Sequence, residues 1–398
     1  MDSLCIRCKG KGWCGKRCRI LDKFMQSAPK VKLHFSGSSP PEVFVGRINY
    51  PNVFSGILAP VVKGDTMELS SPEEWVGKDL SIEQILEMRG QLIYGRSQGH
   101  IKSFSKVSQE IAMSSKPVST EFFLKKQPRL DFTPSKFFSI MTNPAPIQRV
   151  ILEENPKIDK KVDYLVSDYD VKAVTALEEL YKSKIQTSHL QRLFASGLLG
   201  VKVQRRLVPT RWSITAVDDT LGKGLLENIR NYPELNDIQL FHNYYNGNHF
   251  EILLLPGAWS FEVIEVSLPG NVWGGINNEY FMQDYEGFFP RKKYAGNVVG
   301  AYYADRLGVC EYLNKIQRQA SVLVLHEERA EYYAPLGVGI IRESIRKAMQ
   351  MSYEKPSTIE EALRIMSGRL KASFSRYKEM SWIINNYGKQ KRISDFLS

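Results

Sequence analysis

The chain has 398 residues, of which 43% are hydrophobic, 11% aromatic and 24% charged. This composition is typical of a folded protein and excludes a long disordered region, while the length exceeds what one compact core usually contains. No stretch approaches the run of about 18 apolar residues that crosses a bilayer, and the N-terminus lacks the apolar core of a secretion signal. We therefore expect a soluble, cytoplasmic protein with reduced cysteines and no membrane partner.

The net charge of +11 is concentrated near the N-terminus. Residues 1–32 carry nine basic and two acidic side chains, and the rest of the chain contributes only +4. Such a segment favours binding to a polyanion such as DNA, although a solvated terminus is often basic too. The candidate nucleic-acid-binding side chains are Arg7, Lys9, Lys11, Lys16, Arg17 and Arg19.

Four of the five cysteines lie within fourteen residues, with the spacing Cys-x2-Cys-x5-Cys-x3-Cys. Four thiolates at this spacing can surround one tetrahedral zinc ion, and the glycines between them let the short loop turn back. A [4Fe–4S] cluster also suits four cysteines, and four unligated thiols are a third interpretation. A segment this small cannot bury a core, so metal binding would supply its folding free energy. The predicted ligands are Cys5, Cys8, Cys14 and Cys18.

The first half of the chain is predicted to mix short strands and helices. A polar linker is expected over residues 21–39, and apolar runs punctuated by Gly and Pro over residues 43–64 predict strands joined by tight turns. Ser81 begins a predicted helix that Gly90 ends. Prolines are frequent over residues 127–148, where we place a possible seam between two lobes.

Two further helices are predicted before residue 200. Val174, Leu177 and Tyr181 are spaced as the buried stripe of an amphipathic helix. The sequence SHLQRLFASG indicates a second helix, which Gly197 ends.

The candidate catalytic residues lie in RRLVPTRWSITAVDDTLG. Apolar and β-branched residues up to Val217 predict a strand, so Asp218 and Asp219 are expected at a strand-to-helix junction. Two carboxylates there can hold Mg²⁺ against a phosphodiester while Arg205, Arg206 or Arg211 binds the phosphate. Alternatively, an aspartate only caps the helix and complements its dipole. The sequence leaves open whether the core is catalytic.

Strands dominate the next part of the chain. Two apolar runs flank Asn246-Gly247-Asn248, which predicts a hairpin, and WSFEVIEVSL continues it as an antiparallel meander. After this, Glu279, Asp284 and Glu286 precede Arg291 and two lysines in an aromatic-rich stretch. That stretch is either a nucleotide-binding loop or a surface loop with balanced charges.

The last hundred residues are predicted to be mostly helical. Thr358 and Glu361 have the spacing of a capping box, and a final helix is expected over residues 373–386. Strands in a run between helices predict an α+β fold, in which an antiparallel sheet packs against helices. The expected organisation is a finger at 1–20, a linker at 21–39, a core at 40–386 and a flexible tail at 387–398.

The tail ends in KQKRISDFLS, where polar and apolar residues recur every three positions. In a 3₁₀ turn, Ile393 and Phe396 would share one side with Leu397 beside them. The arrangement of Gln390, Ile393, Phe396 and Leu397 resembles the PIP box that docks proteins on the PCNA sliding clamp, with Leu397 where a second aromatic is usual. The alternative is a tail that folds back on its own domain.

Together with the cysteine cluster and the tail, several stretches resemble the archaeal Nre family of DNA-repair proteins. They are VFVGRINYPNVFSGILAPVV, ENPKIDKKVDYLVSD, RRLVPTRWSITAVDDTLG and YAGNVVGAYYADRLGVCEYL. The resemblance implies a zinc-finger-like N-terminus, PCNA binding and a role in DNA repair. The resemblance does not supply a chemical activity for the core. A metal-dependent nucleotide- or phosphate-processing enzyme, holding a nucleotide in the core, therefore remains the alternative function.

Overall fold

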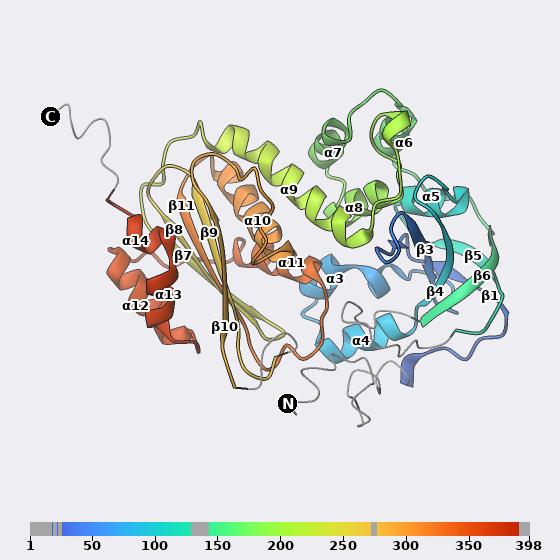
Figure 1. Ribbon diagram of the computed structural model, residues 1–398, viewed down its shortest axis with the longest axis horizontal. Coiled ribbons are helices and arrows are strands. Elements are labelled where there is room, and N and C mark those ends of the chain that lie inside the picture. The colour runs from blue at the N-terminus through green and yellow to red at the C-terminus, as the bar shows by residue number, and fades with distance from the viewer. Residues whose placement is uncertain (1–17, 19–21, 23–25, 129–142, 272–276, 390–398) are drawn as a thin grey trace. The chain divides into compact units, whose positions relative to one another are not determined.

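The computed structural model describes residues 18, 22, 26–128, 143–271 and 277–389 (Figure 1). Its residues form two compact units, and along the chain one boundary between them falls within a long helix, α9 (Thr210–Ile229). Of the described residues, the N-terminal unit contains those within Cys8–Leu221 and Ala334–Ile340, and the C-terminal unit contains those within Gly222–Tyr333 and Ile341–Ser398. Among the described residues, no helix is long and apolar enough to cross a membrane.

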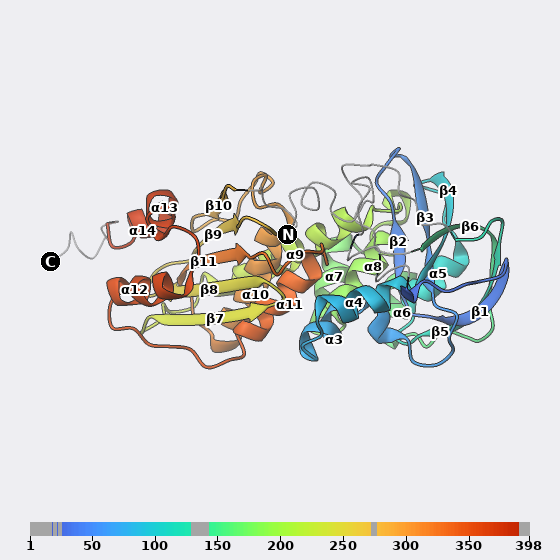
Figure 2. The same cartoon turned by 90° about the horizontal axis from the view of Figure 1, so that it is seen from below.

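The N-terminal unit is built on a six-stranded mixed sheet, in the order β1-β5-β6-β4-β3-β2, which is curled in Figure 2. Its strands are β1 (His34–Ser39), β2 (Val43–Val45), β3 (Asn52–Ala59), β4 (Ile93–His100), β5 (Val118–Leu124) and β6 (Asn143–Leu152). The expected linker 21–39 therefore differs from the structure, because its last six residues form an edge strand paired with β5. The expected strands within residues 43–64 are confirmed as β2 and β3.

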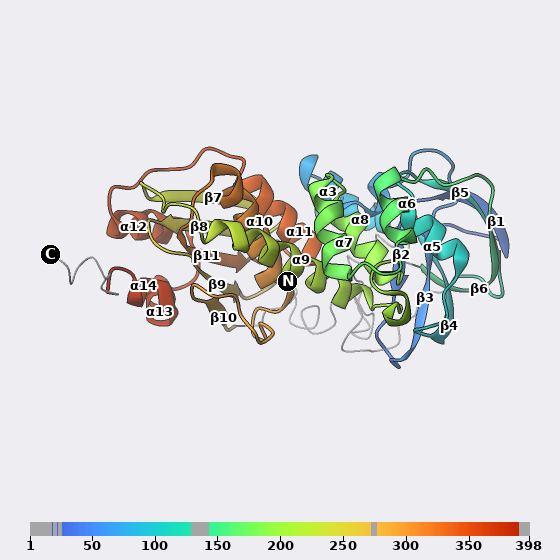
Figure 3. The ribbon, with the colours of Figure 1, turned by 90° about the horizontal axis from the view of Figure 1, so that it is seen from above.

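Besides the first part of α9, six α-helices lie wholly within the described part of the N-terminal unit. They are α3 (Pro72–Gly77), α4 (Ile82–Gly90), α5 (Lys106–Met113), α6 (Lys160–Ser167), α7 (Ala173–Lys182) and α8 (Thr187–Ala195). Helix α5 packs on the sheet, while α6, α7 and α8 lie together in Figure 3. The predicted start of α4 is confirmed: the Gln84 amide donates to Ser81 Oγ, and the Ser81 amide donates to Gln84 Oε1.

Two helices of this unit correct the sequence analysis. In α7, Leu177 is buried as predicted but Val174 is 52% exposed, because Ala176 and Leu180 complete the buried face instead. In α9, the segment predicted as a strand up to Val217 is helical from Thr210 onward. Its β-branched residues favour a strand locally, yet Ser213, Val217 and Leu221 are buried at helical spacing, so packing decides the conformation.

The C-terminal unit contains a five-stranded sheet in the order β10-β9-β11-β8-β7. Its strands are β7 (Gln239–Tyr245), β8 (Asn248–Leu255), β9 (Ser260–Ser267), β10 (Tyr280–Glu286) and β11 (Ser321–Glu328). The predicted hairpin is confirmed, with Asn246 and Gly247 at positive φ between β7 and β8. The predicted meander is wrong beyond β8, because β11 lies between β8 and β9 and is parallel to β9.

Helices cover both faces of this sheet. In Figure 1, α10 (Gly300–Ile316) and α11 (Val338–Ala348) lie on one face, and α12 (Ile359–Arg369), α13 (Phe374–Met380) and α14 (Trp382–Asn386) lie on the other. The expected cap of α12 is confirmed, since the Glu361 amide donates to Thr358 Oγ1 at 3.1 Å. The expected final helix is divided in two at Ser381. Sheets packed with helices confirm the α+β class.

Candidate functional site

Most of the predicted finger and all four key residues of the predicted tail lie outside the described residues. The residues outside the description are three of the predicted metal ligands, Cys5, Cys8 and Cys14, and the six basic candidates, Arg7, Lys9, Lys11, Lys16, Arg17 and Arg19. The four tail residues, Gln390, Ile393, Phe396 and Leu397, are also outside it. Cys18 is described and is 8% exposed, with its carbonyl accepting from the Asp22 amide at 2.7 Å. The four-cysteine metal site and the clamp-docking tail remain predictions.

The candidate catalytic aspartates lie in the middle of α9, where no strand-to-helix junction exists. Asp218 is fully buried and accepts a hydrogen bond from Gln191 Nε2 at 3.0 Å. Asp219 is the next residue, so its side chain points about 100° away around the helix axis. Two carboxylates that diverge in this way are poorly arranged to share one ion. Arg211, in the first turn of the same helix, is exposed.

The described residues contain no group of three or more His, Cys, Asp or Glu side chains arranged to hold a metal ion. The acidic stretch that precedes Arg291 is mainly structural. Asp284 Oδ1 pairs with Arg291 Nη1 at 2.9 Å, and Glu286 Oε2 pairs with Arg306 Nη1 at 3.0 Å. Both carboxylates are buried and anchor the loop that follows β10, while Phe289 at 75% exposure points outward. For the stretch that precedes and includes Arg291, a surface loop with balanced charges therefore fits better than a nucleotide-binding loop, although Asp284 and Glu286 are buried.

A buried cluster in the C-terminal unit was not found from the sequence. Glu265 on β9, Asp305 on α10 and His326 on β11 come together on the α10 face of the sheet. Glu265 Oε2 lies 3.5 Å from His326 Nδ1, and Asp305 is close enough to Glu265 for their charges to interact. Both carboxylate oxygens of Asp305 are buried without a hydrogen-bond partner among the described residues.

Burial holds this cluster in its uncharged forms. It raises the pKa of Glu265 to about 8, and it raises the pKa of Asp305 well above its ordinary value, with the Glu265 charge as a second cause. Burial also lowers the pKa of His326 to about 4. At neutral pH, a protonated carboxyl therefore faces a neutral imidazole. His326 Nε2 lies 3.1 Å from Asn248 Oδ1 and donates to it, which leaves Nδ1 unprotonated and, among the described residues, without a hydrogen-bond partner.

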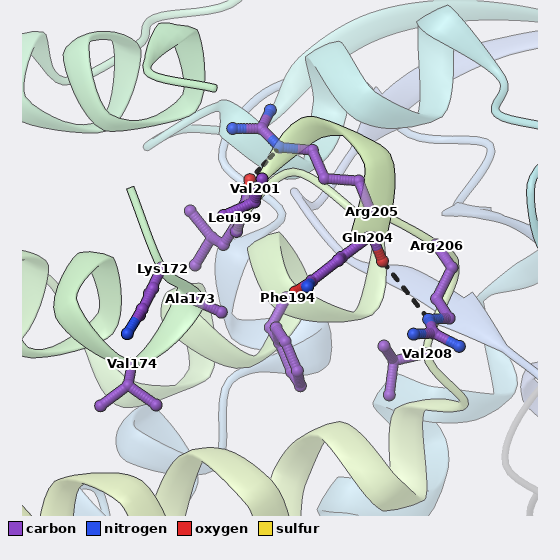
Figure 4. Close-up of a pocket in the computed structure, with 11 residues that line it drawn as sticks. Lys172, Ala173, Val174, Phe194, Leu199, Val201, Gln204, Arg205, Arg206 and Val208 are labelled. Atoms are coloured by element: carbon purple, nitrogen blue, oxygen red, sulfur yellow. Dashed lines mark hydrogen bonds between the residues drawn. The ribbon is translucent and has the colours of Figure 1, made fainter. Parts of the chain in front are cut away.

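The N-terminal unit contains a separate basic site around residues 172–212. A pocket of about 390 Å³ opens between α7, α8 and the segment after α8 (Figure 4). Its wall is mostly apolar and includes Phe194, while Lys172, Gln204 and Arg206 add polar groups. Arg205 turns away and donates to the carbonyls of Gly200, Val166 and Asp168, so it holds the segment in place. Lys172 and Arg206 remain exposed at this pocket.

Comparison with known proteins gives matches along almost the whole chain. The model of the archaeal Nre N-terminal region matches residues 13–274, and that of the archaeal Nre C-terminal region matches residues 286–396. DNA repair protein NreB of Archaeoglobus fulgidus is 35% identical over 99% of this chain and 100% of its own length. DNA repair protein NreA of Haloferax volcanii is 34% identical over 94% of this chain and 91% of its own. DNA repair protein NreA of Archaeoglobus fulgidus is 35% identical over 92% of this chain and 93% of its own length. No solved structure matches.

Proposed function

We propose a function from the premise that the chain belongs to the archaeal Nre family and is a DNA repair protein. In this proposal, it contacts DNA or a repair partner through its basic, cysteine-rich N-terminus and docks on the PCNA sliding clamp through its C-terminal residues. The observation that carries the proposal is the end-to-end similarity to proteins named for DNA repair, over 99% of this chain in one case.

The C-terminal sequence supports clamp docking. Gln390, Ile393, Phe396 and Leu397 have the spacing of a PIP box, and they follow closely after α14 ends at Asn386. A short peptide of this kind inserts its apolar side chains into a pocket of the partner, while Lys391 and Arg392 complement an acidic rim. A flexible tether also raises the effective concentration of a second, weaker site on the same DNA.

The cysteine spacing supports a structural zinc ion at the N-terminus. Cys5, Cys8, Cys14 and Cys18 provide four thiolates for one tetrahedral ion, with a [4Fe–4S] cluster as the alternative. Native mass spectrometry of the intact chain distinguishes them, because loss of one zinc mass on denaturation is expected. A loss that matches an iron–sulfur cluster would replace the zinc proposal with a redox-sensing one.

Calorimetry with PCNA tests the docking proposal. Phe396→Ala is expected to abolish binding of the chain to the clamp without changing its melting temperature. Phe289→Ala is the matched control, since it removes another exposed phenylalanine, in the loop after β10. Clamp affinity that survives Phe396→Ala would refute docking through the tail.

One observation favours a second candidate, a nucleotide- or phosphate-processing enzyme recruited by the same tail. Glu265, Asp305 and His326 form a buried group in which a neutral carboxyl can act as a general acid. This cluster, rather than the Asp218 and Asp219 pair, is the candidate catalytic site of such an enzyme. Turnover of a nucleotide that disappears in Asp305→Asn, while the variant keeps its melting temperature, would support the enzyme.

A further inference from the structure

The N-terminal unit has an uneven distribution of charge that the net charge of the chain does not reveal. Between Glu179 and Asp218 there is no acidic residue at all. The same stretch contains seven basic side chains: Lys182, Lys184, Arg192, Lys202, Arg205, Arg206 and Arg211. A second stretch without acidic residues runs from Arg89 to Gln109. Both stretches belong to the same compact unit.

The fold brings these two stretches into contact. The Leu207 amide donates to the Ile101 carbonyl at 2.7 Å. Gly197 has a φ of +68°, and a Cβ there would lie 2.5 Å from the Phe104 ring and 2.8 Å from the Arg206 carbonyl. Only glycine fits this approach, so the end of α8, in the first stretch, packs closely against Phe104 in the second. In the second stretch, Arg89 and Lys106 pair with Glu42 and Glu110, so the excess positive charge comes mainly from the stretch between Glu179 and Asp218.

Several cations of this region are exposed and lack an acidic partner. Lys172, Lys202, Arg206 and Arg211 make no ion pair with a carboxylate among the described residues. Arg211 also lies close to a second cation, Arg47, whose pKa is lowered by partial burial and by the Arg211 charge. Like charges held close together raise the free energy of the isolated protein, and binding of a polyanion relieves that repulsion.

Exposed aromatic side chains accompany these cations. Trp212, next to Arg211, is 45% exposed, and its ring lies 5.2 Å from that of Tyr50, which is 41% exposed. Along the chain, Trp212 comes four residues after Val208, which lines the pocket together with the apolar Phe194 and the exposed Arg206 (Figure 4). Aromatic faces and an apolar pocket fit planar bases, which a duplex keeps stacked and a single strand exposes.

We propose that this basic aromatic face, comprising Lys172, Phe194, Lys202, Arg206, Arg211 and Trp212, binds single-stranded DNA. The cations contact phosphates, Trp212 stacks on an unpaired base, and the pocket beside Phe194 receives another. The proposal rests on the DNA-repair role proposed above and names a DNA-binding surface in the core, apart from the cysteine-rich segment. It involves no chemical step.

Fluorescence anisotropy of the full-length chain with a labelled single strand, in the absence of PCNA, tests the proposal. The double variant Arg206→Glu, Arg211→Glu is expected to weaken binding at least tenfold. The slope of log affinity against log salt is expected to fall by about 1.4, since each phosphate contact on a single strand contributes about 0.7. The matched control is Lys157→Glu, Lys160→Glu, which changes the net charge equally within the same unit but beside Glu153, Glu154 and Asp159.

Trp212→Ala tests the stacking part without changing any charge. It is expected to weaken single-strand binding about fivefold or more while leaving the salt slope unchanged. The wild-type chain is expected to prefer the single strand over a duplex of equal length. Equal losses in the two double variants, or an unchanged affinity in Trp212→Ala, would overturn the proposal. Because PCNA is absent, this result is independent of the clamp titration.

Discussion

Buried acidic residues of the C-terminal unit fall into two groups that differ in their hydrogen-bond donors. Glu262 accepts from the amides of Trp382 and Ile383 and from the Ser381 hydroxyl, so it anchors the start of α14. Glu265, three residues later on the same strand, faces His326 at 3.5 Å. The Glu265 carboxyl is mostly buried and has few hydrogen-bond donors around it, so its charged form is less stable than its protonated form in this environment.

This difference predicts a pH-dependent stability that one substitution removes. The pKa of Glu265 is about 8 in the folded chain and about 4.5 when unfolded, so the unfolded state releases its proton first. Stability is therefore lost as the pH rises from about 4.5 to 8. Denaturant unfolding at pH 5 and at pH 8 measures this loss as the difference between the two free energies of unfolding. Glu265→Gln is expected to make that difference smaller by at least about 1.4 kcal/mol, the equivalent of one pKa unit. Parallel curves for the two proteins would contradict this.

The two aspartates of α9 predict unequal effects on stability. Asp218→Ala leaves the buried Gln191 amide without its acceptor and is expected to cost about 1–3 kcal/mol in the free energy of unfolding. Asp219 is only half-buried, so Asp219→Ala is expected to cost less. Urea unfolding of both variants measures the difference, and a larger loss for Asp219→Ala would show that Asp218 is not the structural member.

At the scale of whole elements, local signals identified the starts of α4 and α12, although not that of α9. Ser81 and Gln84 form the complete capping box of α4, and Thr358 caps α12, because these hydrogen bonds join residues only three apart. Strand order was not predictable in the same way. The insertion of β11 between β8 and β9 depends on pairs of residues 61 to 80 positions apart, and no short sequence pattern predicts it.

The anchoring of α14 gives a prediction at this scale. Glu262→Ala removes the acceptor for two helix amides and the Ser381 hydroxyl, so the C-terminal unit is expected to lose about 2–4 kcal/mol of stability. Amide hydrogen exchange should show earlier loss of protection in α14 than in α12. Protection of α14 equal to the wild type would mean that packing alone holds the helix.

For the whole molecule, the candidate sites differ in how much the sequence reveals. The cysteine cluster and the tail are continuous motifs, so spacing alone identifies them. Glu265, Asp305 and His326 are brought together only by the fold, and their separation in sequence hides them. The basic aromatic face lies between these cases, because the stretch from Glu179 to Asp218 without acidic residues is visible in the sequence. The net charge of the whole chain does not reveal this local excess of basic residues.

The central claim is that one chain joins contact with DNA to docking on the sliding clamp. The most direct measurement is the affinity of the full-length chain for DNA that carries a loaded PCNA ring, compared with the same DNA without it. Linkage of two sites predicts at least tenfold tighter binding in the presence of PCNA, and Phe396→Ala removes that gain while leaving binding to bare DNA unchanged. Equal affinity with and without PCNA would contradict the account.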